Sequence, residues 1–195
     1  MMNIKSNKLV FKNARIIDPF SGFDNIGDLI TEDKVIKDFG INLLKENSPD
    51  DALIIDCKNH VLCPGFIDLN ANIGEPGEEF KENINTASDA ALASGITSIV
   101  CMPNTDPIID QIPIIQYIEK RAKETNGVKI YPSASITKNL EGKQLTEMGL
   151  LLEAGAILFS EANKVISDTK VMKQALTYAK NFDATIMISP QDPDL

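Results

Sequence analysis

The sequence has very little histidine: its 195 residues include one, His60. Imidazole is the commonest neutral metal ligand in proteins and the usual general base near pH 7. A chain with a single histidine cannot build a multi-histidine metal centre from its own side chains. This scarcity excludes the ordinary form of several classes of metalloenzyme.

Cysteine is also sparse, with Cys57, Cys63 and Cys101 as the whole set and no CxxC pair among them. An odd number of scattered cysteines argues against a disulfide framework. Without a CxxC pair, a structural zinc site is not expected. We expect all three residues to be ordinary buried thiols.

Long apolar runs and an excess of positive charge are both missing. No run of about 18 apolar residues is present, which excludes a transmembrane helix, and "MMNIKSNKLV" lacks the apolar core of a signal peptide. The formal net charge of −9 would repel phosphate backbones. These features predict a cytoplasmic protein that binds neither nucleic acid nor membrane.

Residues 1–64 have the pattern of a β-rich segment. Short apolar or alternating runs are separated by turns that contain Gly, Pro, Asn and Asp. The runs are "KLVFKNARIID", "GDLITEDKVIKDFG" and "ALIIDCKNHVLCPG", and "LKENSPDD" predicts a loop. No helix of useful length is expected in this part.

Residues 65–195 alternate between strand and helix patterns. The predicted strands are "GFIDL", "ITSIVCM", "VKIYPSA", "AILFS" and "ATIMIS", and helices are expected over 81–94, 111–126, 142–155 and 169–182. Asp110 and Asp168 are the predicted N-caps of the second and fourth helices, with Pro113 in the first turn of the second. Such alternation implies a parallel sheet, with apolar strands covered by helices. It can be an open doubly wound sheet or part of a (β/α)₈ barrel, which needs eight strands.

Residues 64–110, "PGFIDLNANIGEPGEEFKENINTASDAALASGITSIVCMPNTDPIID", resemble the dihydroorotase family of cyclic amidohydrolases. "YPSASITKNLEGKQLTEMG" and "ISPQDPDL" continue the resemblance in the same order. It implies a partial (β/α)₈ barrel of about five βα units over 65–195, preceded by a small β-sandwich-like segment over 1–64. Members of this family hydrolyse or close the ring of dihydroorotate in pyrimidine synthesis, at a zinc centre.

The first barrel strand of that family ends in Asp-Leu-His-x-His-x-Arg. Here Asn70 and Asn72 stand at the two histidine positions, and Gly74 replaces the arginine that grips the substrate carboxylate. An amide oxygen is a poor, neutral ligand for zinc, and a glycine cannot make a bidentate charged contact. We expect both asparagines to cap turns or bond neighbouring loops, and Asp68 to order the strand end.

The remaining family positions are altered too. Ser189 stands where a His-x-Glu-Asp-Pro pattern supplies a third ligand, within Ser-Pro-Gln-Asp-Pro at 189–193. Glu161, in a segment where the family has Ser-Asp-Asp-Gly, could coordinate a metal but lacks partners, so we expect it to be solvated or a helix cap. Asn104, which contacts substrate in the family, is kept. His60 precedes the first barrel strand, and we expect it to be structural.

The resemblance therefore predicts a non-catalytic dihydroorotase-like chain with no bound zinc and no catalytic residues. Inactive chains of this family stabilise aspartate transcarbamoylase, which implies such a partner here, or else a homo-oligomer. Two alternatives stay open. The chain can be an active zinc-dependent amidohydrolase whose missing ligands come from elsewhere, or a fragment of a longer chain with no function alone.

Overall fold

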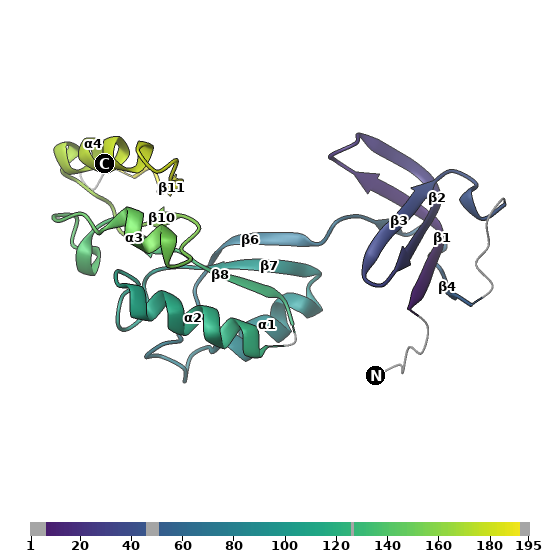
Figure 1. Ribbon diagram of the computed structural model, residues 1–195, viewed down its shortest axis with the longest axis horizontal. Helices are drawn as coiled ribbons and strands as arrows, with labels where there is room; N and C mark the ends of the chain where they lie inside the picture. The colour runs from purple at the N-terminus through teal and green to yellow at the C-terminus, as the bar shows by residue number, and fades with distance from the viewer. Residues whose placement is uncertain (1–6, 46–50, 126, 192–195) are drawn as a thin grey trace. The chain divides into compact units, whose positions relative to one another are not determined.

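The computed structural model describes residues 7–45, 51–125 and 127–191. It divides into two compact units, Met1–Pro64 and Gly65–Leu195 (Figure 1). In neither unit is any helix of the described residues long and apolar enough to cross a membrane.

The first unit is built on one β-sheet. β1, β2 and β3 form an antiparallel meander, while β4 and β5 pair parallel to β1. A single turn of 3₁₀-helix, η1, lies at the start of the predicted loop, whose residues 46–50 are outside the described part of the chain. The bounds are β1 Lys8–Asp18, β2 Phe23–Glu32, β3 Val35–Gly40, η1 Leu43–Lys45, β4 Leu53–Asp56 and β5 Val61–Leu62.

One face of this sheet is apolar. Phe11 lies opposite Leu29, and Leu29 lies opposite Phe39, so the three side chains form a row across β1, β2 and β3. Phe39 also meets Phe23 edge to face, with ring centroids 5.3 Å apart. The alternation that marked these runs as strands therefore gathers their apolar side chains on one surface.

The second unit alternates parallel strands with helices. β6, β7 and β8 form one three-stranded parallel sheet, and β9, β10 and β11 form another. Ser133 alone separates β8 from β9; its N–H donates to the carbonyl of Cys101 in β7, and the Ile157 N–H donates to that of Pro132 in β8. The bounds are β6 Phe66–Ala71, α1 Ile84–Ala93, β7 Ile96–Cys101, α2 Ile112–Glu124, β8 Lys129–Pro132, β9 Ala134–Ser135, η2 Lys138–Leu140, α3 Met148–Glu153, β10 Phe159–Ser160, α4 Thr169–Lys180 and β11 Ile186–Met187.

The helix starts confirm one predicted cap and correct another. Asp168 caps α4, because its carboxylate accepts from the Lys170 N–H at 2.8 Å. The prediction for Asp110 was wrong: Gln111 is the N-cap of α2, without a side-chain cap bond. The Asp110 carboxylate instead accepts from the N–H of Asn139, 3.0 Å away in the turn that follows β9.

α3 is much shorter than the predicted helix over 142–155. Leu145 forms an antiparallel bridge with Thr137, and the Thr146 N–H donates to the carbonyl of Ile136 at 3.0 Å. Backbone groups before Met148 are therefore used in strand-like pairing, and the helix can begin only at that residue.

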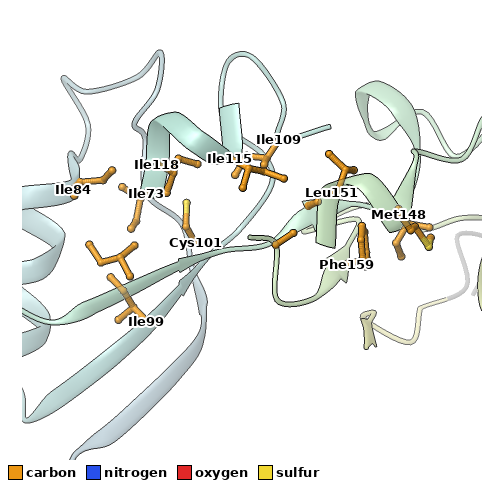
Figure 2. Close-up of a cluster of buried hydrophobic side chains, with 14 of the residues drawn as sticks. Ile73, Ile84, Ile99, Cys101, Ile109, Ile115, Ile118, Met148, Leu151 and Phe159 are labelled. Carbon is orange, nitrogen blue, oxygen red and sulfur yellow. The ribbon is translucent and has the colours of Figure 1, made fainter. Parts of the chain in front are cut away.

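The main core lies where the helices pack on the parallel strands. Figure 2 shows it as a continuous layer that runs from Ile84 and Ile99 past Ile115 to Met148 and Phe159. Ile99 belongs to this layer, whereas its neighbour Val100 belongs to a second cluster with Leu158. β7 is thus covered on both faces, as predicted for strands of a parallel sheet.

Two expectations about burial were wrong. On β6, the side chains of Phe66, Ile67 and Leu69 are 63%, 64% and 53% exposed, because this strand pairs only with β7 in the described part of the chain. Among the cysteines, Cys101 is buried, but Cys63, which follows β5 at the end of the first unit, is exposed. Burial raises the pKa of the Cys101 thiol to about 12.

Candidate functional site

The residues singled out from the sequence follow the carboxyl ends of the parallel strands. Asn70 lies in the last part of β6, with Asn72 and Gly74 just beyond it. Asn104 follows β7, Glu161 follows β10, and Ser189 follows β11. In parallel α/β folds this edge of the sheet is where functional groups gather.

The two asparagines are exposed at the strand end. As predicted, Asp68 orders this turn, since its carboxylate accepts from the Asn70 N–H at 2.9 Å. The predicted role of the amides as caps or loop bridges was wrong, because neither side chain of Asn70 and Asn72 forms a hydrogen bond with another described residue. Both side-chain amides are therefore exposed to solvent.

Gly74 sits where a side chain has no room. A β-carbon at this position would lie 2.5 Å from the Glu78 carbonyl oxygen and 2.9 Å from that of Glu82. The Glu78 N–H also donates to the Gly74 carbonyl at 2.6 Å, which closes the turn tightly. An arginine could occupy position 74 only if this loop moved. The loop therefore has no space for the arginine that grips the substrate carboxylate in the family.

Next to Gly74, a buried carboxylate fixes the same loop. Glu75 is 2% exposed and accepts from Arg121 Nε at 2.7 Å, the Tyr117 hydroxyl at 2.8 Å and the Ile84 N–H at 2.9 Å. Burial alone raises the pKa of Glu75, but these bonds and the charge of Arg121 outweigh it and hold the pKa below its ordinary value. The group ties the loop after β6 to α1 and α2.

Sequence reasoning missed this group. Its available signal was the spacing of Tyr117 and Arg121, which are four residues apart and therefore on one side of α2. A charged residue and a tyrosine on the side of a helix that packs inward require a buried partner. The sequence could not say which of the many acidic residues this partner is.

We expected Glu161 to be solvated or a helix cap, but it is buried, with 2% of its surface exposed. One carboxylate oxygen accepts from the Thr137 N–H at 2.6 Å, and both accept from the Thr137 hydroxyl at 3.0 Å. Burial nevertheless raises the pKa of Glu161 above its ordinary value. The expectation failed because no helix begins here: Ala162 has a φ of 51°, and its N–H bonds the Ser160 hydroxyl at 3.1 Å.

The structure brings Glu161 and Ser189 together. Both line a cavity of about 160 Å³ at the ends of β10 and β11, with Lys164 and Gln191 also in its wall. Asn104 is exposed, and no hydrogen bond in the described chain joins it, Asn70 or Asn72 to this cavity. Asp192 and Pro193, the end of the Ser-Pro-Gln-Asp-Pro segment, lie outside the described residues.

These donors do not fit a zinc ion. They are neutral amide and hydroxyl oxygens plus one carboxylate, Glu161, whose two oxygens are already bonded to Thr137. Zinc in proteins prefers imidazole, thiolate and carboxylate ligands. Residues 7–45, 51–125 and 127–191 contain no group of three or more His, Cys, Asp or Glu side chains placed to hold a metal ion. His60 belongs to the first unit, where its Nδ1 lies 2.7 Å from the Cys57 carbonyl oxygen.

Comparison with known proteins identifies the family. The family described as Dihydro-orotase-like matches residues 59–195, which is most of the chain. The chain belongs to this dihydroorotase-like family. This confirms the resemblance to the dihydroorotase family that was predicted from the sequence.

Curated relatives of this dihydroorotase-like chain are named dihydroorotase. The protein from Syntrophus aciditrophicus is 41% identical over 188 residues, which cover 96% of this chain and 44% of the relative. The protein from a Wolbachia of Drosophila simulans is 43% identical over 188 residues, covering 96% of this chain and 42% of the relative. The chain thus spans less than half the length of these relatives.

Solved structures show the fold of the dihydroorotase-like chain. An L-hydantoinase (dihydropyrimidinase) from Arthrobacter aurescens matches with a TM-score of 0.74 and 18% identity, over 92% of this chain and 40% of the other. A crystal structure of a dihydroorotase matches with a TM-score of 0.66 and 14% identity, over 96% and 52%. The mixed α/β fold of this chain thus has its neighbours among the barrel-forming amidohydrolases.

Proposed function

We propose that this chain is a non-catalytic dihydroorotase-like protein of pyrimidine biosynthesis. The observation that carries the proposal is the donor set at the strand ends, which has Asn70, Asn72 and Ser189 where histidines would be needed. The carboxylate of Glu161 is engaged by Thr137. A chain with this donor set has no means to activate a water molecule at neutral pH by metal coordination.

The fold part of the proposal is a partial barrel of about five βα units behind a β-sandwich-like segment. The parallel strands of the second unit are hydrogen-bonded to one another in chain order, β6 to β7 to β8 and β9 to β10 to β11. When β8 and β9 are counted as one interrupted strand, this makes five strands. The helices α1 to α4 lie between them in sequence. This succession supports a barrel segment over an open doubly wound sheet, in which the strand order reverses at a switch point.

Substrate recognition is reduced in the same proposal. Asn104 is retained as a vestigial contact to the substrate, but the arginine that would grip a carboxylate is absent, and Gly74 leaves no space for one. The loss of a bidentate charged contact removes both affinity and orientation. We therefore expect dihydroorotate to bind weakly and without turnover.

The proposed role is structural: the chain binds and stabilises aspartate transcarbamoylase in the cytoplasm. This partner comes from the family resemblance, and the net charge of −9 is compatible with a protein partner rather than a nucleic acid. A homo-oligomer is the second form such a scaffold can take. An interface of either kind requires a complementary surface, not a catalytic site.

The second candidate is an active zinc-dependent dihydroorotase or cyclic amidohydrolase, with ligands supplied by another polypeptide. Its support is the 41–43% identity to relatives that are named dihydroorotase. The third is a fragment of a longer chain, without function alone, which the 42–44% coverage of those relatives supports.

The test is zinc content and dihydroorotase activity of the purified chain, alone and mixed with aspartate transcarbamoylase. The dihydroorotase of Syntrophus aciditrophicus, purified in parallel, is the positive control. We expect no stoichiometric zinc and no turnover in either direction, together with a complex on gel filtration. Stoichiometric zinc with turnover would overturn the proposal in favour of the active enzyme. Absence of both activity and complex would favour the fragment.

A further inference from the structure

Two buried glutamates of the second unit differ in their partners. Glu75 and Glu161 are each 2% exposed. Glu75 has a cationic partner in Arg121, and a hydroxyl and a backbone N–H complete its hydrogen bonds. Glu161 accepts bonds from Thr137 alone, and no ion pair joins it to a lysine or arginine of the described residues. Because a buried carboxylate is costly without a positive partner, Glu161 is one cationic group short.

One oxygen of the Glu161 carboxylate has room for a further donor. The N–H and the hydroxyl of Thr137 both bond the first oxygen, whereas the second oxygen is reached only by the same hydroxyl, at 3.0 Å. A hydroxyl has one hydrogen, so it cannot serve both oxygens fully. Since Glu161 lines the cavity of about 160 Å³ at the ends of β10 and β11, a ligand in this cavity can supply the missing donor.

A tight turn places a positive charge in the wall of the same cavity. The Lys164 N–H donates to the Glu161 carbonyl at 2.9 Å, and Ala162 between them has a φ of 51°. The Lys164 ammonium donates to the Leu140 carbonyl at 3.1 Å, which uses one of its three hydrogens. Two charged donors are therefore left for an anionic group.

The other lining residues are mainly apolar, and the cavity is small. Its volume is that of about five water molecules, well below the range of drug-sized ligand pockets. The cavity therefore suits a compact molecule with an ammonium, a carboxylate and a short apolar group. The remaining wall consists of Val165, Ile166, Met172, Ile188, Ser189, Pro190 and Gln191.

We propose that this cavity binds a free α-amino acid with a short apolar side chain, such as valine. Its ammonium bonds the second oxygen of Glu161, its carboxylate bonds Lys164, and its side chain contacts the apolar wall. A divalent metal ion fits less well, because Glu161 is the only carboxylate among the described lining residues and Lys164 would repel the ion. The inference rests on that part of the proposed function which leaves this site without zinc.

The experiment is titration calorimetry of the purified full chain, freed of metal with EDTA, using L-valine as the ligand. We expect one bound L-valine per chain, with a dissociation constant below about 1 mM. Valinamide lacks the carboxylate and 3-methylbutanoate lacks the ammonium, so each should bind about tenfold more weakly or worse. No binding of L-valine, or equal affinities for the three compounds, would overturn the proposal.

Substitutions in the wall test the two charged contacts separately. E161Q and K164A should each weaken L-valine binding by about tenfold or more. K164A is at an exposed position, so it tests the proposal even where E161Q alters folding, which thermal melts would reveal. K173A is the matched control, because Lys173 is exposed and lines a different cavity beside α4; it should stay within about twofold of the original. Equal effects of K164A and K173A would contradict the proposed contact.

Two comparisons separate this inference from the proposed function. Dihydroorotate that binds more tightly than L-valine, and loses affinity in E161Q, would overturn the inference in favour of a retained substrate site. Stoichiometric zinc with turnover in the purified chain would overturn the proposed function, while the titration of the metal-free chain decides the amino-acid site by itself. A zinc-free, inactive chain that does not bind L-valine would overturn this inference alone.

Discussion

Arg121 Nε lies 2.7 Å from a carboxylate oxygen of Glu75, across 46 residues of sequence. The Glu75 side chain is 3% exposed and that of Arg121 is 28% exposed, so the carboxylate is buried and the guanidinium reaches it from the rim. Tyr117 and the backbone of Ile84 supply the other hydrogen bonds of this carboxylate. The position of the loop that carries Gly74 thus depends on a buried carboxylate that accepts three hydrogen bonds, one of them from a charged guanidinium.

Replacing Glu75 by Gln should lower the free energy of unfolding by about 2–4 kcal/mol at neutral pH, because Arg121 and Tyr117 lose a charged acceptor inside the protein. The measurement is urea denaturation of the wild type and E75Q. E78Q is the control, since Glu78 makes an exposed ion pair with Lys81 at 2.6 Å, and its loss should cost less than about 1 kcal/mol. Similar losses in both variants would contradict the special role of Glu75.

The same pair predicts a pH dependence. The folded-state pKa of Glu75 is held below its ordinary value of 4.5, so the unfolded chain takes up the proton first as the pH falls. The advantage of the wild type over E75Q should be complete above about pH 5 and should shrink as the pH falls through the folded-state pKa. Denaturation curves at several pH values check this, and an advantage that grows on acidification would contradict it.

Gly74 and Gly40 give a matched pair of substitutions. G74A should destabilise the protein by about 1–3 kcal/mol, since its β-carbon would meet the carbonyl oxygens of Glu78 and Glu82 at less than a normal contact distance. G40A should be nearly neutral, because no heavy atom lies within 4 Å of the added carbon. Thermal melts of both variants test this, and a neutral G74A would mean that the loop yields easily.

Much of the fold could be predicted because local patterns set it. The strand over residues 8–18 and the cap at Asp168 both come from alternation or side-chain chemistry within a few residues. The late start of α3 could not be predicted, since it depends on the pairing of Leu145 with Thr137 across a turn. Asp110 failed as a cap for the same reason: its partner, Asn139, is 29 residues away.

The candidate site divides in the same manner. The identities at positions 70, 72 and 189 are visible in the sequence, and a family pattern is enough to notice them. The closure of the loop at Gly74 and the burial of Glu161 depend on contacts with Glu78 and Thr137, which no periodicity reveals. The family resemblance therefore identifies which residues are altered, while only the tertiary contacts show what surrounds them in this chain.

Glu161 should respond to pH in the sense opposite to Glu75. Burial raises its folded-state pKa above the ordinary value of 4.5, so its contribution to stability is complete below that value and is lost as the pH rises through the folded-state pKa. E161Q removes this titration and still offers an oxygen to the Thr137 N–H. The stability of E161Q relative to the wild type should therefore increase from about pH 4 to pH 8. A constant difference across this range would mean that Glu161 does not titrate as inferred.

Changing both Asn70 and Asn72 to Ala should leave the protein almost unaltered. Both side chains are exposed, and neither amide bonds another residue of the described chain, so the free energy of unfolding should change by less than about 0.5 kcal/mol. Binding to aspartate transcarbamoylase, where it is observed, should stay within about twofold. D68A is the contrasting variant, because it removes the acceptor of the Asn70 N–H and should loosen the strand end. A large loss of stability or of partner binding in N70A/N72A would mean that the two amides have acquired a function of their own in place of metal binding.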